Sequence, residues 1–60
     1  MTVILNLKCL YTGKEYSQEI NPLAEFFRKN PLGEIADWIS LRGNELYDTQ
    51  LELVSYSVVR

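Results

Sequence analysis

The 60-residue chain contains no histidine and only one cysteine, Cys9. Histidine is the commonest general base and metal ligand in enzymes, so its absence removes most familiar catalytic and zinc-binding arrangements. A single cysteine excludes an intramolecular disulfide and a thiolate cluster around a structural metal. We therefore expect no catalytic residue, no metal site and no cofactor, and we expect Cys9 to be a small residue of the core.

Long apolar runs and glycine-rich segments are also missing. No stretch approaches the roughly 18 apolar residues of a membrane-spanning helix, and the N-terminus lacks the pattern of a secretory signal, so we expect a cytoplasmic protein that does not engage a membrane. Gly13 and Gly43 stand alone in the sequence, not in a phosphate-binding loop. We predict a turn at Gly13, and we predict that Gly43 is the left-handed residue that ends a helix.

Positive charge is sparse and unevenly distributed. Residues 1–29 carry four basic and three acidic side chains, whereas residues 30–60 carry two basic and five acidic ones. A nucleic-acid-binding protein needs a concentrated positive face to displace counterions from phosphates, which this distribution does not supply. The acidic second half is better matched to a basic surface on a partner protein.

The first third of the chain has the alternation of a β-hairpin. Residues 2–10 alternate with the period of a half-buried strand, residues 11–14 supply a turn, and residues 15–20 resume a short strand. The second strand is charged along one side, which is typical of a sheet edge. The predicted inward-facing residues are Val3, Leu5, Leu7 and Cys9 on the first strand, with Tyr16 and Ile20 on the second.

Two copies of one helix-start signal follow, Asn21-Pro22-Leu23 and Asn30-Pro31-Leu32. Asn is a favoured N-cap, and Pro at the first helical position loses no hydrogen bond. The signals predict helices over residues 22–29 and 31–42. The expected core-facing residues are Leu23, Ala24, Phe26 and Phe27 in the first helix, and Leu32, Ile35, Ala36 and Ile39 in the second, with Trp38 beside them.

A competing interpretation makes residues 38–42 a strand that turns at Gly43 and Asn44 into residues 45–47, because Trp, Ile and Gly-Asn also suit a hairpin. Residues 50–59 are rich in β-branched and aromatic side chains and predict a long strand beside the first one. Their apolar alternation changes face near Leu53 and Val54. This change indicates either a β-bulge or a central strand that is apolar on both faces.

These elements predict an α+β domain of order β-β-α-α-β, in which two short helices cover one face of a mostly antiparallel sheet. The turn at Thr12-Gly13-Lys14, the following helix and residues 41–46 also resemble the ubiquitin-like β-grasp pattern. That resemblance implies the alternative order β-β-α-β-β. The chain lacks the Gly-Gly tail that conjugation or sulfur carriage requires in that family.

The sequence favours a small non-enzymatic protein-binding module that acts as a stoichiometric inhibitor or modulator, of a size that phages and other mobile elements often encode. The alternative is a self-associating homodimer, and nucleic-acid binding is less favoured. We expect an apolar and aromatic patch on the sheet face away from the helices to give affinity, while acidic side chains steer a basic partner. The candidate partner-binding residues are Glu34, Asp37, Trp38, Glu45, Tyr47, Asp48, Glu52 and Tyr56.

Overall fold

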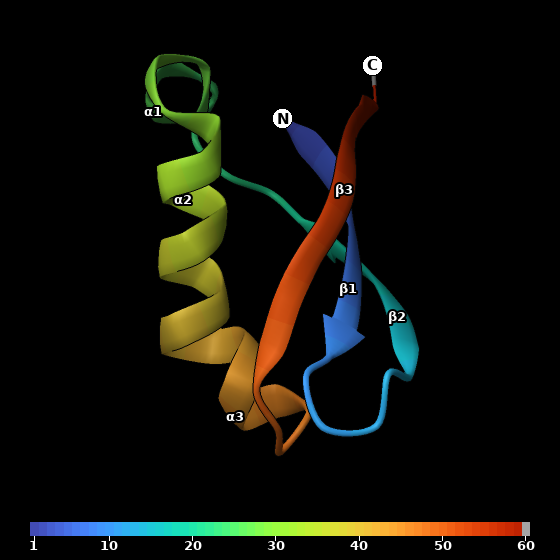
Figure 1. Ribbon diagram of the computed structural model, residues 1–60. Coiled ribbons are helices and arrows are strands. Elements are labelled where there is room, and N and C mark those ends of the chain that lie inside the picture. The colour runs from blue at the N-terminus through green and yellow to red at the C-terminus, as the bar shows by residue number, and fades with distance from the viewer. Residues whose placement is uncertain (60) are drawn as a thin grey trace.

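The computed structural model describes residues 1–59 and has a sheet layer covered on one face by a helical layer (Figure 1). The elements are β1 (Thr2–Cys9), β2 (Glu15–Ile20), α1 (Ala24–Lys29), α2 (Pro31–Trp38), the π-helical turn η1 (Ile39–Gly43), α3 (Asn44–Leu46) and β3 (Leu51–Val59). The predicted α+β class and the β-β-α-α-β order are confirmed. Within residues 1–59, no helix is long and apolar enough to cross a membrane.

The sheet has the strand order β2-β1-β3, and β1 pairs antiparallel with both neighbours. Gly13 has a φ of 75° in the hairpin turn, a conformation that glycine adopts without steric cost. The predicted inward face is confirmed. Its buried members are Val3, Leu5, Leu7, Cys9 and Ile20, with Tyr16 half-buried beside them.

A β-bulge in β3 resolves the change of face in the last strand. Asn6 pairs with Ser55 whereas Leu7 pairs with Leu53, so Val54 is the extra residue. The bulge confirms one of the two sequence interpretations, and the other is wrong because β3 is an edge strand. Its consequence is that Leu53 and Tyr56 both lie opposite core residues of β1.

The sheet face away from the helices is mostly polar, with Ile4 and the exposed Leu10 as its apolar residues from the first strand segment, so the extended apolar patch predicted there is wrong. Asn6 Nδ2 donates to Ser55 Oγ at 2.9 Å across this face. Lys8 lies between its cross-strand partners Glu15 and Glu52. The physical reason is the bulge, which turns the apolar residues on both sides of Val54 toward the helices and leaves serines and charges outside.

The two Asn-Pro-Leu copies behave differently. Asn30 caps α2, because its Oδ1 accepts from the Gly33 N–H at 3.2 Å, and Pro31 is the first helical residue as predicted. Asn21 does not cap α1, so that prediction is wrong. Its Oδ1 accepts from Thr2 Oγ1 at 3.2 Å, and α1 begins only at Ala24 without a side-chain cap. Asn21 directly follows β2 and is still held at the sheet, so the chain must cross to the second layer before a helix can begin.

The helices bury fewer residues than their apolar stripes predicted. Phe27 and Ile35 are fully buried, and Trp38 and Ile39 are half-buried against the core. Both helices are short and lie against a narrow three-stranded sheet, which leaves their remaining apolar residues outside. The predicted core residues that are instead exposed are Leu23, Phe26, Leu32 and Ala36.

Gly43 does not end a helix, so that prediction is also wrong. It has a helical φ of −61°, and helical structure runs through η1 and α3 to Leu46. The left-handed residue is Asp48, with a φ of 52°, and beside it the Thr49 N–H donates to the Asn44 carbonyl at 3.1 Å. This is the hydrogen-bond pattern of a Schellman C-cap. The strand interpretation of residues 38–47 and the β-grasp alternative are therefore wrong.

Candidate partner-binding groove

An open groove of about 1170 Å³ lies between the C-terminal half of β2 and the helical segment. We call it the β2–helix groove. One wall follows β2 and the chain that leaves it, and the other follows α2, η1 and α3. The residues that line it are Gln18, Glu19, Ile20, Asn21, Pro22, Glu34, Asp37, Trp38, Leu41, Arg42, Glu45 and Leu46.

The helical wall is built by residues spaced three and four apart. Glu34, Trp38, Leu41 and Glu45 follow one another at this spacing, and Asp37 lies three residues after Glu34 and four before Leu41. The continuous helical segment from α2 to α3 therefore places them on one side. Four of these five residues were predicted from sequence as partner-binding candidates, whereas Leu41 and, beyond it, Leu46 were not. The spacing would have identified Leu41 within the predicted helix, whereas Leu46 lies beyond residue 42, where that helix was predicted to end.

The groove is acidic. Its helical wall carries the carboxylates of Glu34, Asp37 and Glu45 and a single guanidinium, that of Arg42, a net charge of −2. Glu19 also borders the groove, but its cross-strand partner is Ile4, so its side chain points to the outer face of the sheet. The helical wall thus concentrates negative charge along the groove, a distribution that attracts a cationic ligand.

Apolar side chains lie among these charges. Leu41 is 75% exposed, and Leu46 is also exposed although it is a large apolar residue. Trp38 is half-buried and packs against the core. Gly43 makes room for its ring, because a β-carbon at that residue would lie 2.7 Å from Trp38 Cζ3. The groove therefore combines a rigid aromatic surface with exposed apolar residues, which are common features of protein-binding sites.

Tyr47, another candidate, supports the groove without lining it. Its ring lies 4.5 Å from that of Tyr16, measured between centroids, and its hydroxyl donates to Gln18 Oε1 at 2.7 Å. Gln18 in turn donates through Nε2 to the Glu19 carbonyl at 2.8 Å. These contacts tie the end of the helical segment to β2 and hold one wall of the groove in place.

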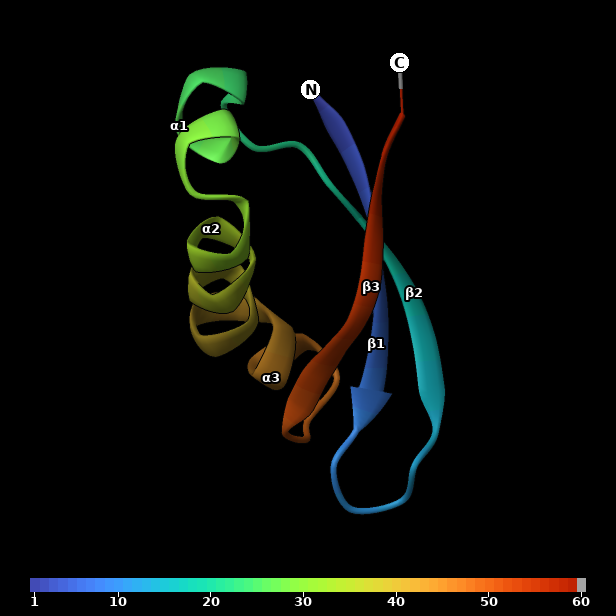
Figure 2. The same cartoon turned by 45° about the horizontal axis from the view of Figure 1, so that its top comes forward.

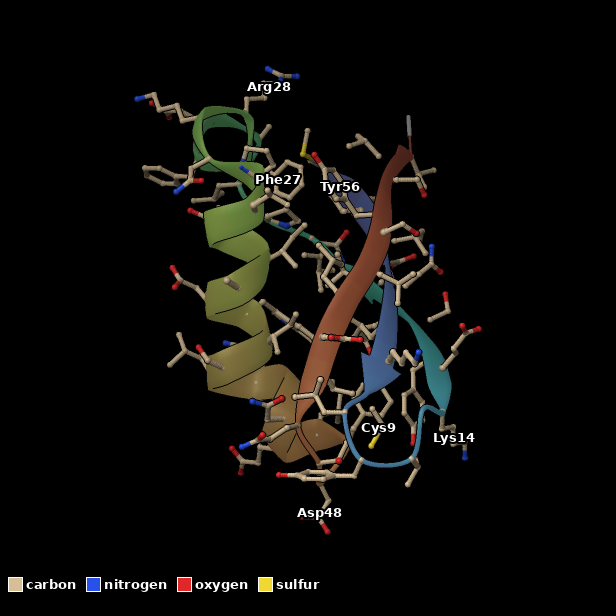
Figure 3. The ribbon with its side chains drawn as sticks, viewed as in Figure 1. Cys9, Lys14, Phe27, Arg28, Asp48 and Tyr56 are labelled. Atoms are coloured by element: carbon tan, nitrogen blue, oxygen red, sulfur yellow. The ribbon has the colours of Figure 1, made fainter. Side chains whose placement is uncertain are left out.

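The other three candidates lie elsewhere. Asp48 is exposed at the C-terminal end of the helical segment, and Glu52 lies on the polar outer face of the sheet. Tyr56 contacts Phe27 edge-on, with 5.7 Å between ring centroids. Figure 3 shows the two side chains next to each other between the helical layer and the sheet. They border a second hollow of about 690 Å³ between α1 and β3.

Cys9 lies at the opposite end of the core from this second hollow and is 4% exposed (Figure 3). Hydrogen bonds from Thr12 and then Thr49 lower the pKa of the Cys9 thiol from 9.0 to about 6, against a smaller rise caused by burial. The Thr49 contact is 3.1 Å long between Sγ and Oγ1. Sequence reasoning missed this effect because it considered only histidine and positive charge as activators of a thiol.

Residues 1–59 contain no group of three or more side chains placed to hold a metal ion. Comparison of the chain with protein families, with curated proteins and with solved structures finds no significant match. The candidate site therefore rests on the geometry described above.

Proposed function

We propose that this protein is a small non-enzymatic binding module that acts as a stoichiometric inhibitor or modulator of a partner protein with a basic surface. The observation that carries the proposal is the β2–helix groove, where Trp38 and Leu41 lie among three carboxylates of the helical wall. Affinity comes from the apolar residues, and the charges select and orient the partner.

The groove suits an arginine or lysine side chain of the partner. The aliphatic part of such a side chain packs on an aromatic or leucine surface while its charged end remains within reach of carboxylates. Glu34, Asp37 and Glu45 are separated by helical turns along one wall, so more than one basic side chain can be engaged at once. Occupation of the groove would block the partner surface that carries these side chains.

Trp38 provides a direct test because it is the only tryptophan in the chain. A short arginine-rich peptide should change Trp38 fluorescence at low ionic strength, and the effect should weaken as salt is added. Asp37→Lys should weaken this binding about tenfold or more, which corresponds to about 1.4 kcal/mol. Glu52→Lys makes the same charge change on the outer face of the sheet and should leave binding nearly unchanged.

Affinity capture from the native host with the wild type and with both variants then identifies the partner. A protein retained by the wild type and Glu52→Lys but lost with Asp37→Lys supports the proposal. Equal weakening by the two variants would show a general charge effect and contradict the groove as the binding site.

A further inference from the structure

We propose that two copies of this chain pair antiparallel through the free edges of their β3 strands, about a two-fold axis at Ser57. The pairing joins both sheets into one continuous antiparallel sheet. The inference does not rest on the proposed function, because it concerns the sheet edge opposite β2.

The two edges of the sheet differ in their protection. β2 carries Glu15 and Glu19, which discourage strand addition, whereas residues 53–59 of β3 contain no charged residue, proline or glycine. Val58 is 43% exposed, and Val54 and Val59 are also exposed. β3 crosses in front of β1 in both views of the ribbon (Figures 1 and 2). A long, uncharged and apolar edge of this kind is a template for pairing with another chain.

The backbone direction identifies which residues of β3 are free to pair. The Cys9 N–H donates toward β2, to Lys14 O at 2.8 Å, and the Leu10 N–H donates to Gln50 O at 3.0 Å on the other side. The side to which backbone N–H and C=O groups point alternates from one residue of a strand to the next. Asn6 and Ile4, which have the parity of Leu10, therefore bond toward β3. Their partners Ser55 and Ser57 accordingly direct their N–H and C=O groups toward β1. Tyr56 and Val58 therefore direct theirs to the open edge.

The bulge selects the register. Pairing across Val54 would interrupt a new ladder, so the regular part of β3 is residues 55–59, and its midpoint is Ser57. Antiparallel pairing about Ser57 places Tyr56 of each copy opposite Val58 of the other. Both are residues with free backbone groups, and two such pairs provide about four hydrogen bonds.

Side chains support the same register. Tyr56 and Val58 border the hollow between α1 and β3, whose other apolar members include Met1 and Phe27. In the pair, this hollow receives the Val58 side chain of the second copy. The Glu52 residues of the two copies would lie ten residues apart along the paired strands, or about 33 Å, so these two negative charges do not oppose each other. A second copy is therefore a better occupant of this uncharged edge than the basic partner of the β2–helix groove.

Disulfide trapping tests the register, with all variants made in a Cys9→Ser background. Residues that face each other in a non-hydrogen-bonded antiparallel pair have Cα atoms about 4.5 Å apart, within the range that a disulfide spans. Ser57→Cys should therefore oxidise to a covalent dimer. Ser55→Cys is the matched control, because it lies exposed on the same face of the same strand but about 13 Å from its counterpart. We expect at least about fivefold more cross-linked dimer from Ser57→Cys, and similar yields or none from both would overturn the proposal.

Light scattering over a dilution series provides the second measurement. The wild-type mass should rise from 7.0 kDa toward twice that value as concentration increases. Val58→Pro removes an N–H that points to the open edge, and it leaves the hydrogen bonds between β3 and β1 in place. This variant should therefore fold but remain monomeric. A wild type that stays monomeric at its highest soluble concentration overturns the proposal, as does a folded Val58→Pro variant that still dimerises.

Discussion

At the scale of single residues, the ring of Trp38 in the groove packs closely over Gly43, where the lack of a side chain leaves room for it. Gly43→Ala would ordinarily stabilise a helix by up to about 1 kcal/mol. Here the new β-carbon would lie 2.7 Å from Trp38 Cζ3 and 3.2 Å from Cε3, and overpacking of this kind costs about 1–3 kcal/mol. We therefore expect a net loss of about 1 kcal/mol, measured by urea unfolding and accompanied by a change in Trp38 fluorescence. Ser40→Ala, at an exposed position of η1, is the control and should stay within about 0.5 kcal/mol of the wild type.

Cys9 makes a second prediction at this scale. Its pKa is lowered from 9.0 to about 6 in the folded protein, chiefly by Thr12 and then Thr49. Folding therefore favours the thiolate, so this contribution to stability is complete above about pH 9 and is lost as pH falls to about 6. As the pH is raised from about 6 to about 9, the unfolding free energy of the wild type should therefore increase relative to that of Cys9→Ser. Ultraviolet absorbance of the thiolate gives its titration directly, and a midpoint near 9 in the folded protein would contradict the prediction.

At the scale of elements, the repeated Asn-Pro-Leu signal offers a matched comparison. Asn30 accepts from Gly33 N–H and caps α2, whereas Asn21 bonds only to the exposed Thr2 hydroxyl. Asn30→Ala should cost about 1 kcal/mol of unfolding free energy, because an N-terminal donor of α2 loses its partner. Asn21→Ala should cost less than about 0.5 kcal/mol. Equal losses in urea unfolding would show that capping does not distinguish the two sites.

The strands and the start of α2 were predictable from local pattern, whereas the start of α1, the end of the helical segment and the helical faces were not. Alternation in β1 identifies the face that packs, because side chains of a strand can point only to two sides. Gly43 is compatible with a left-handed cap and with a close contact inside a helix, and only the position of Trp38 decides between them. Likewise, Leu32 and Phe26 lie on apolar helical stripes, but the narrow sheet covers too little of each helix to bury them. Such outcomes depend on the tertiary arrangement and not on local sequence.

At the scale of the whole molecule, the candidate groove depends on both layers. Glu34, Asp37, Trp38 and Glu45 were identified as partner-binding candidates from charge and aromatic character, and a single helical wall brings them together. Gln18 and Ile20 could not be assigned to the same site from sequence, because their place in the groove depends on the tertiary arrangement of the two layers. The proposed pairing through β3 would leave this groove open in both copies, so one dimer would present two binding sites to a partner.

Self-association should also change the thermal stability of the whole molecule. A domain of this size buries a small core, so an additional interface is a large part of its stability. If only folded chains dimerise, the melting temperature should rise with protein concentration, by about 3 °C for each tenfold increase above the dissociation constant. Ser57→Lys places two positive charges together at the two-fold axis and should remove this dependence. Ser17→Lys introduces the same charge on the opposite sheet edge and should preserve it, so calorimetry of the three proteins separates dimerisation from net charge. A wild-type melting temperature that stays constant over about a hundredfold range of concentration would contradict a dimer of folded chains.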